Sequence, residues 1–215
     1  MITITVINSD DAPDRLVSMW AEADRLGLSM RRQKGDGPAT LADHRAAWRH
    51  IVESDDPCGV VMSDRTAPDD GLVALLQPNF LDLLLARHDL VLLDVEDRDD
   101  EAEVQTVRPL RRAVPETAAY IMSRKAAVAA LESGTADTLH GVLNGLRSQG
   151  VAPAFVSPPI LSAQSPMDER KDDGLALRPR RALGRRLRAM RSRGGEIVVP
   201  RTPTRQAQPE ESISA

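Results

Sequence analysis

Charged side chains that directly follow short apolar runs are the residues of this sequence best suited to chemistry. Asp64 and Arg65 come after the apolar run 59–62, and Asp94 begins a group of carboxylates after the run 90–93. A carboxylate in such a place can hold a divalent cation, and a guanidinium can pair with phosphate through two parallel hydrogen bonds. Asp64 is therefore the first candidate for a metal or phosphate site, and the alternative is a simple loop carboxylate.

The acidic run after residue 93 has a different interpretation. It holds seven acids, which are Asp94, Glu96, Asp97, Asp99, Asp100, Glu101 and Glu103. A dense run of like charges is typical of a solvated loop. We favour that interpretation over a second metal motif.

His44 is a further candidate, either as a base or as a ligand. It shares the apolar stripe of segment 41–53 with Trp48. A histidine on the apolar face of a helix is more often a packed core residue whose ring is hydrogen-bonded. We therefore predict that His44 belongs to the core.

The elements that must position these residues alternate between strands and helices. Predicted strands cover 2–7, 59–62, 90–93, 118–123 and 154–157, and predicted helices cover 13–26, 41–53, 70–76, 124–132 and 138–149. Gly27 supplies the stop signal of the first helix. This alternation favours an α/β fold with a mostly parallel sheet flanked by helices, in which 90–93 is a central strand.

Composition divides the chain into two parts. Residues 1–165 supply one domain of ordinary size, and residues 166–215 form a basic, Pro-rich tail that we expect to be flexible. Between residues 170 and 193 ten Arg or Lys stand against two Asp, about +8, so the rest of the chain carries about −12 of the net charge of −4. Leu183, Leu187 and Met190 share one helical face in this tail, which suits an anionic membrane surface. A solvated tail and a nucleic-acid contact are the alternatives.

Several classes of protein are excluded or disfavoured by composition. Only five residues are aromatic, so stacking on nucleic-acid bases is not expected. Cys58 is the lone cysteine, which excludes an internal disulfide and an all-cysteine metal cage. The first residues show no secretory signal, and no apolar run reaches the roughly 20 residues of a membrane span. We expect a cytoplasmic location, with contact to the inner membrane through the basic tail.

Five strings of residues occur in a fixed order between residues 3 and 166. They are Val6, Ile7 and Asn8 with Asp14, Arg15, Asp36 and Gly37; His44, Arg45 and Trp48; the run 88–93; the run 119–127; and Asp137 with Pro158 and Pro159. In this order they resemble glycosyltransferase family 25, the bacterial lipooligosaccharide galactosyltransferase-like group. The resemblance implies a GT-A-like fold that moves a hexose from a UDP-sugar donor to a lipopolysaccharide-type glycan or glycolipid acceptor.

The resemblance also implies roles for individual residues. Asn8 and Arg15 would contact the nucleotide sugar, as would Asp36 and Gly37, and Asp137 would act as a base near the acceptor. The residues alone leave other interpretations open. Asn8 can cap a strand, Arg15 can be a solvated helix residue, and an Asp-Gly pair is a common turn.

One departure from the family bears directly on the chemistry. The family follows its second strand with Leu-Glu-Asp-Asp, whose carboxylates hold a divalent cation against the diphosphate, whereas this chain has Met62, Ser63, Asp64 and Arg65. Asp64 is the remaining metal ligand, so Mn²⁺ binding should be weakened. Either Arg65 pairs with the diphosphate in place of the metal, or the chain is a non-catalytic relative that binds a sugar nucleotide or a partner protein.

Overall fold

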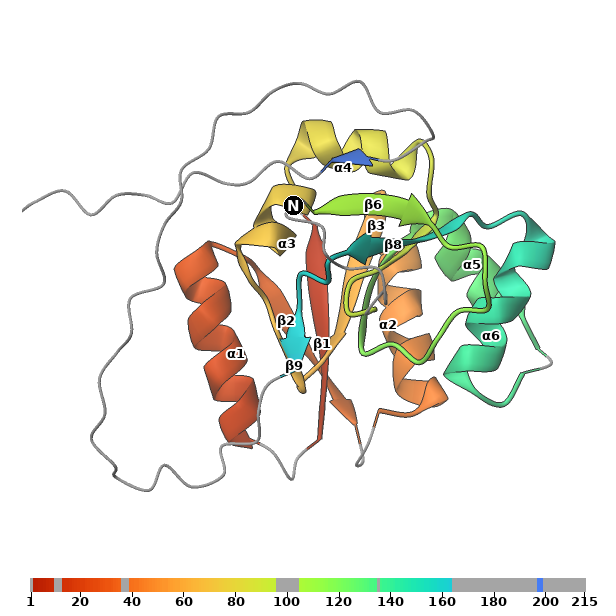
Figure 1. Cartoon of the computed structure of the whole chain (residues 1–215). Coiled ribbons are helices and arrows are strands. Elements are labelled where there is room, and N and C mark those ends of the chain that lie inside the picture. Colours follow the sequence, from red (N-terminus) through yellow and green to blue (C-terminus); the bar gives the residue numbers. More distant parts are fainter. Residues whose placement is uncertain are drawn as a thin grey trace, which may run out of the picture.

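The computed structural model (Figure 1) describes residues 2–9, 13–35, 39–95, 105–134, 136–163 and 197–198. Its strands are β1 (Thr3–Ser9), β2 (Met30–Gly35), β3 (Cys58–Ser63), β4 (Thr66–Ala67), β5 (Leu90–Leu92), β6 (Thr106–Pro109), β7 (Ala119–Ser123), β8 (Pro153–Ser157), β9 (Ser162–Ala163) and β10 (Ile197–Val198). Its helices are α1 (Pro13–Leu26), α2 (Leu41–Glu53), α3 (Asp70–Leu75), α4 (Pro78–Leu85), α5 (Arg124–Glu132) and α6 (Leu139–Gly145), and the 3-10 helix η1 (Leu146–Gln149) follows α6. All the strands and helices predicted from the sequence are present, although the helix predicted over 138–149 divides into α6 and η1.

The main sheet is mixed, with the strand order β10-β6-β8-β5-β7-β3-β1-β2. The pairs β1–β2, β1–β3 and β5–β8 are parallel. The pairs β3–β7, β5–β7, β6–β8 and β6–β10 are antiparallel. The prediction of a mostly parallel sheet is therefore wrong at β6 and β7, which run against the other strands. An apolar run has the same pattern in both reading directions, so the sequence marks a strand without giving its direction.

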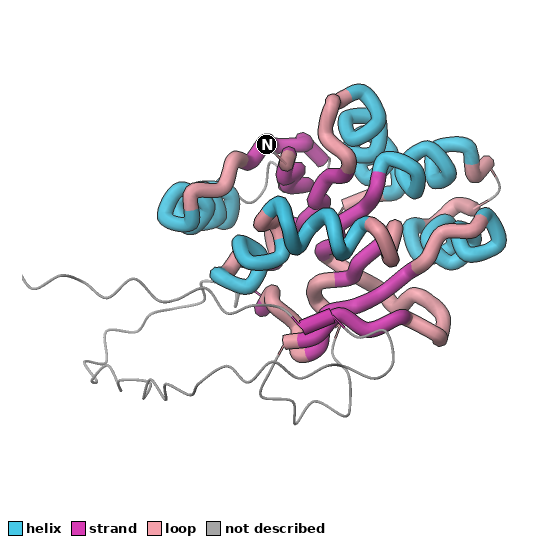
Figure 2. The backbone as a smooth tube through the Cα atoms, turned by 90° about the horizontal axis from the view of Figure 1, so that it is seen from above, coloured by secondary structure: helices cyan, strands magenta, loops and turns pink. Residues whose placement is uncertain are grey.

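Helices cover both faces of the sheet (Figure 2), and each face has its own core. One core joins strand residues such as Val6 and Ile121 to α1, α3 and α4. The other joins alternate strand residues such as Tyr120 and Met122 to α2, α5 and α6. Successive side chains of a strand point to opposite faces, so a strand covered on both sides must be apolar at every position. This explains the continuous apolar runs at β3, β5 and β7.

Helix α2 lies close against the sheet. Its first turn is fixed by a capping box, in which the Thr40 side chain accepts from the Asp43 N–H and the Asp43 carboxylate accepts from the Thr40 N–H at 2.8 Å. A Cβ atom at Gly59 in β3 would lie only 2.5 Å from Cγ1 of Ile51 in α2. Glycine at this position therefore allows the helix and the strand to approach each other.

Helix α1 ends where the sequence predicted. Gly27 has a positive φ of 67°, which glycine adopts without strain. The Leu28 N–H donates to the Ala23 carbonyl at 2.8 Å, and the Gly27 N–H donates to the Asp24 carbonyl at 3.1 Å. These bonds satisfy carbonyls of the last turn, as in other helices that end at a glycine.

Strands β2 and β6 were not predicted from the sequence. The β2 segment contains Arg31, Arg32, Gln33 and Lys34, and in the described sheet it lies at the edge, next to β1. An edge strand needs fewer apolar side chains, and charges there discourage pairing with another chain. Such a strand lacks the apolar pattern on which prediction depends.

Only a short piece of the basic tail is described. Ile197 and Val198 form β10, which pairs antiparallel with Val107 and Thr106 of β6. The segment containing Leu183, Leu187 and Met190 lies outside the described residues, so the boundary at residue 165 and the membrane contact stay predictions.

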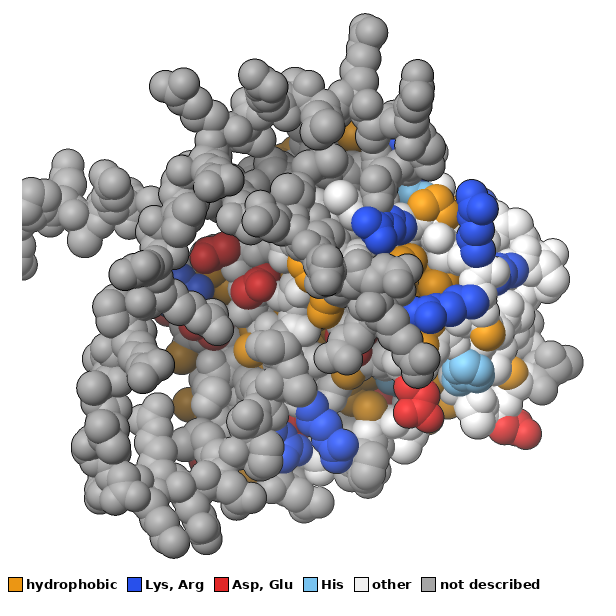
Figure 3. All heavy atoms as spheres, viewed as in Figure 1, with side chains coloured by type: hydrophobic (Ala, Val, Ile, Leu, Met, Phe, Trp, Pro, Cys, Tyr) orange, Lys and Arg blue, Asp and Glu red, His pale blue; other side chains and the backbone are white. Residues whose placement is uncertain are grey.

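None of the helices in the described ranges is long and apolar enough to cross a membrane. The described part of the face in Figure 3 carries both basic and acidic side chains.

Candidate functional site

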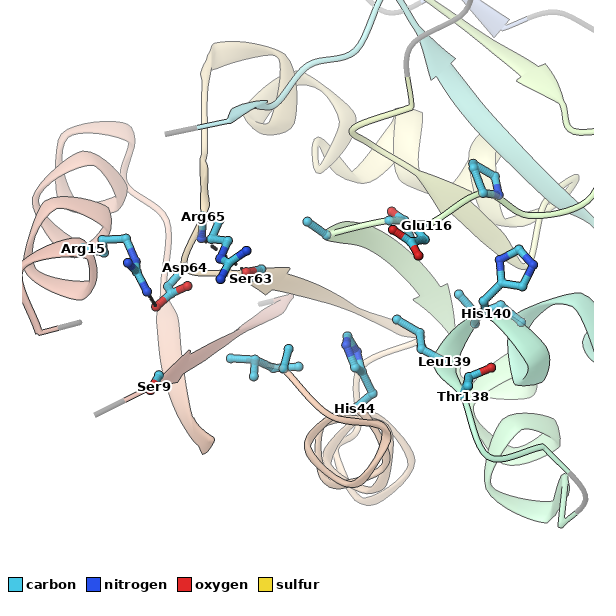
Figure 4. Close-up of a pocket in the computed structure, with 16 residues that line it drawn as sticks. Ser9, Arg15, His44, Ser63, Asp64, Arg65, Glu116, Thr138, Leu139 and His140 are labelled. Carbon is cyan, nitrogen blue, oxygen red and sulfur yellow. Dashed lines mark hydrogen bonds and ion pairs between the residues drawn. The ribbon is translucent and has the colours of Figure 1, made fainter. Parts of the chain in front are cut away.

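A pocket of about 600 Å³ opens at the carboxyl ends of β1 and β3 (Figure 4). Because β7 runs antiparallel to β3, the segment 115–118 that precedes β7 reaches the same edge of the sheet. The starts of α2 and α6 complete the wall. The lining residues are Ile7, Ser9, Arg15, Ala39, His44, Ser63, Asp64, Arg65, Pro115, Glu116, Thr117, Ala118, Thr138, Leu139, His140 and Leu143.

Asp64 connects two segments at one end of this pocket. Its Oδ2 accepts from Nδ2 of Asn8 at 2.8 Å and from a terminal guanidinium nitrogen of Arg15 at 3.1 Å. The Asp64 side chain is 6% exposed, whereas that of Arg15 is 40% exposed. The carboxylate is therefore satisfied inside the protein, and the ion pair directs Arg15 to the rim of the pocket. The buried Nε of Arg15 has no hydrogen-bond partner in the described structure.

The backbone around Asp64 is held from several sides. The Asp64 N–H donates to the Ile7 carbonyl at 3.1 Å, and the Ser63 N–H donates to the Ala118 carbonyl at 2.7 Å. Thr66 donates its hydroxyl to the Ser63 carbonyl at 2.8 Å and pairs with Ala163 in the small β4–β9 sheet. Arg65 thus lies in a short, well-anchored turn between two strands.

Arg65 is the exposed cation of the site. Its backbone N–H donates to the Ser63 hydroxyl at 3.3 Å. Across the described ranges its guanidinium has neither an ion pair nor a hydrogen bond. Figure 4 shows Arg15, Asp64 and Arg65 together at one end of the pocket, with Thr138 and His140 at the other. Arg65 can therefore pair with an anion that enters the pocket.

Asp94 fixes the opposite wall and is not simply solvated. It is partly buried, and its carboxylate accepts from the Thr117 hydroxyl and from the Ala118 N–H. Asn144 of α6 holds the same segment, because its Oδ1 accepts from the Val114 N–H at 2.7 Å. These contacts position Glu116, which is exposed at the wall of the pocket. The preference for a solvated loop is corrected at Asp94, while residues 96–104 lie outside the described residues.

His44 is buried, as predicted, and it also lines the pocket. Its Nδ1 lies 2.8 Å from the hydroxyl of Tyr120, which also accepts from Nε1 of Trp48 at 2.9 Å. Burial lowers the pKa of His44 to about 4, against a smaller opposing effect of the Asp43 charge. The imidazole is therefore neutral at physiological pH.

The structure brings together four of the predicted site residues, which are Asn8, Arg15, Asp64 and Arg65. Asp36 and Gly37 lie outside the described residues. Asp137 does not line this pocket. It lines a second hollow of about 410 Å³ together with Arg45 and Arg49. Its predicted role as a base stays a prediction, in a place that the structure does not join to Asp64.

The described residues do not fit a manganese site. Oδ2 of Asp64 is already shared between Asn8 and Arg15, and Arg65 places a positive charge beside it. In the part of the chain that the structure describes, no three His, Cys, Asp or Glu side chains gather as a metal would require. Mn²⁺ prefers several oxygen ligands, so we expect these residues to bind Mn²⁺ weakly.

Two residues of the pocket were missed by sequence analysis, Glu116 and His140. Glu116 sits in a short segment without periodicity, and His140 follows the N-cap residue Thr138 of α6. Their position depends on the antiparallel direction of β7 and on the packing of α6. The sequence carries no local signal for either.

Comparison with known proteins gives only a distant likeness of fold. No model of a protein family matches the chain, and no curated protein is significantly similar to it. The inositol-1-phosphate CTP transferase from T. maritima is similar at 11% identity over 74% of this chain and 68% of its own, with a TM-score of 0.42. HddC from Yersinia pseudotuberculosis has 12% identity over 72% and 89%, with a TM-score of 0.46. A197 from STIV has 11% identity over 78% and 87%, with a TM-score of 0.45. At these values the likeness carries no argument about activity.

Proposed function

We propose that this chain binds a nucleotide sugar in the pocket at β1 and β3 and transfers its hexose to a glycan, as a glycosyltransferase of the family 25 type. The observation that carries the proposal is the guanidinium of Arg65, which has no ion pair or hydrogen bond within the described ranges and lies next to an Asp64 that Arg15 already neutralises. A planar guanidinium suits a diphosphate, since it donates two parallel hydrogen bonds. The volume of about 600 Å³ is in the usual range for small-molecule sites.

In this proposal Arg15 and Arg65 stabilise the negative charge on the diphosphate, which a metal ion stabilises in the family. Charge develops on the diphosphate as it leaves the sugar, and fixed cations stabilise that charge without reorganising. Arg65 faces the pocket directly, and Arg15 is held at its rim by Asp64. The reaction would then proceed without Mn²⁺.

The proton of the acceptor hydroxyl also needs a destination. Glu116 lines the same pocket as Arg65, so we assign it this role in preference to Asp137. The hydroxyl oxygen bonds to the anomeric carbon, its proton passes to the Glu116 carboxylate, and the diphosphate leaves with the electrons of the broken carbon–oxygen bond. Each group in this step is supplied by the pocket or by the two substrates.

A second function is favoured by the incomplete acidic motif. Ser63 and Arg65 stand where the family has carboxylates, and Asp64 is engaged internally. A chain with these features can keep a sugar nucleotide in the same pocket without transferring the sugar. Binding is common to both functions, and turnover separates them.

Calorimetric titration with UDP-galactose, with Mn²⁺ or with a chelator, tests the proposal. We expect binding whose affinity changes by less than about threefold when Mn²⁺ is removed. Arg65→Gln should weaken it by about tenfold, the usual effect of losing a charge-assisted hydrogen bond of about 1.5 kcal/mol. Arg87→Gln is the matched control, because Arg87 is exposed and lies outside the pocket lining.

Release of UDP in the presence of a lipooligosaccharide acceptor then measures transfer. Turnover that falls in Glu116→Gln supports the enzyme, and binding without turnover supports the second function. A wild-type protein that binds no UDP-sugar, with or without Mn²⁺, would overturn both.

A further inference from the structure

Three side chains from two elements form a hydrogen-bonded chain that ends at the pocket. Trp48 and His44 lie one turn apart on α2, and Tyr120 lies in β7. The Tyr120 oxygen is 2.9 Å from Trp48 Nε1 and 2.8 Å from His44 Nδ1. Trp48 and Tyr120 have no exposed surface, and His44 retains 4%. The chain therefore lies in the core, and His44 is its member at the pocket wall.

The direction of each hydrogen bond follows from the chemistry of the three groups. An indole nitrogen can only donate, so the Tyr120 oxygen accepts from Trp48. The Tyr120 hydroxyl has one proton of its own, and His44 Nδ1 is its partner within the described structure. Tyr120 must donate that proton to Nδ1, since a buried donor without an acceptor is strongly unfavourable. If His44 Nδ1 donated to the Tyr120 oxygen instead, the phenol proton would have no acceptor.

The proton of the neutral imidazole is then on Nε2. In the described residues Nε2 has no hydrogen-bond partner. Figure 4 shows the His44 ring projecting between Ser63 and Arg65 on one side and Leu139 and Thr138 on the other. Because Nδ1 is engaged by Tyr120 and the ring lines the pocket, we place the Nε2–H group in the interior of the pocket, between its two ends.

We propose that His44 Nε2–H is a fixed hydrogen-bond donor to an oxygen of the bound sugar nucleotide, with Tyr120 and Trp48 as its positioning residues. This inference rests on the proposed function, because it names how the same pocket holds its ligand. It also assigns His44 to binding and not to proton abstraction. The lone pair that a base would need is on Nδ1, where the Tyr120 proton occupies it.

Long-range ¹H–¹⁵N correlation NMR of the histidine rings tests the tautomer directly, without any ligand. We expect a pyridine-like Nδ1 and a pyrrole-like Nε2 for His44, assigned by comparison with His44→Gln. In Tyr120→Phe the ring loses the donor at Nδ1, and we expect a mixture of tautomers. A pyrrole-like Nδ1 in the wild-type protein would overturn the inference, whether or not UDP-galactose binds.

Calorimetry with UDP-galactose tests the donor role. His44→Gln keeps an N–H group near the place of Nε2 and should bind within about threefold of wild type. His44→Leu fills the site without a donor and should bind about tenfold more weakly, as expected for loss of one hydrogen bond. Tyr120→Phe should weaken binding by about threefold, although Tyr120 does not line the pocket.

The outcomes separate the two proposals. If wild type binds UDP-galactose and a folded His44→Leu protein binds equally well, the donor role fails and the proposed function stands. If His44→Leu does not fold, a loss of affinity of about tenfold in a folded His44→Gln protein overturns the donor role, because Gln retains the N–H group. If wild type binds no UDP-sugar, the proposed function fails, and the ligand assigned to His44 fails with it.

Discussion

The two hydrogen-bonded networks at the pocket are built in opposite ways. The network around Asp64 joins β1, α1 and the end of β3 through a charged carboxylate, which accepts from the neutral amide of Asn8 and from the guanidinium of Arg15, and Arg15 remains partly open to solvent. The network around Tyr120 joins α2 to β7 through neutral groups, and it is almost completely buried. Each connects residues more than 45 positions apart in the sequence.

The difference shows where in the fold charged groups and neutral polar groups can be placed. A charge is expensive to bury, so the buried Asp64 carboxylate is paired with Arg15, whose side chain stays partly exposed at the rim, where solvent and an incoming anion can reach it. A neutral network can be placed in the core, provided that every donor has an acceptor. The charged end can therefore attract a ligand, while the neutral end holds one donor in a fixed direction.

The pH dependence of stability should show the largest effect of the buried network. Folding lowers the pKa of His44 from 6.5 to about 4, mainly because the ring is buried. Between these pH values the unfolded chain binds more protons, so stability is full above pH 6.5 and falls as the pH falls toward 4. The loss from His44 should approach about 3 kcal/mol of unfolding free energy.

Urea unfolding of wild type and His44→Gln across this pH range measures that loss. His50 and His88, whose pKa values burial also lowers, are common to both proteins and cancel in the difference. Parallel pH profiles for the two proteins would contradict the prediction.

Removal of the central hydroxyl should have the next largest effect. Tyr120→Phe leaves the Trp48 N–H and the His44 Nδ1 without their partner, at a cost of roughly 1–3 kcal/mol in the free energy of unfolding. Equilibrium urea unfolding near pH 7 measures it. Trp48→Phe alone and combined with Tyr120→Phe completes a double-mutant cycle. Strict additivity of the two losses would show that the groups do not interact.

Changes of charge at the other network should alter metal affinity by about tenfold. Rebuilding the acidic motif with Ser63→Glu and Arg65→Asp leaves Oδ2 of Asp64 bonded to Arg15, so we expect little gain in Mn²⁺ affinity. Adding Arg15→Met frees that carboxylate, and affinity should then rise by about tenfold, or about 1.4 kcal/mol. Calorimetric titration with Mn²⁺ compares the two variants. A large gain in the first variant would mean that the motif has merely decayed around an open site.

The smallest effect should come from the ion pair itself. Asp64→Asn keeps the shape of the side chain but removes its charge, and it should lower the free energy of unfolding by about 1 kcal/mol, because Arg15 is 40% exposed. The difference from wild type should shrink at high salt, which screens exposed charges. Arg25→Gln, which breaks an exposed pair with Glu22 on α1, is the matched control and should change stability less. A difference that does not depend on salt would show that the Asp64 charge is not screened.

Local features of the sequence predicted most of the elements and one end of the site. Gly27 and the helical periodicity of 41–53 predicted the end of α1 and the extent of α2, because caps and apolar stripes are read within a few residues. Asp64 and Arg65 were found in the same way, as charges that follow an apolar strand. These signals lie within short stretches of the sequence, so they can be recognised without knowledge of the fold.

The tertiary structure decided the rest of the site. The antiparallel direction of β7 brings the segment containing Glu116 to the edge where β3 ends, and it places the Tyr120 hydroxyl beside α2. No local pattern indicates the direction of a strand, because an apolar run has the same pattern in both directions along the chain. His44 was predicted as a core residue from its stripe, and only the packing of α2 on β7 shows that the same ring also faces the pocket.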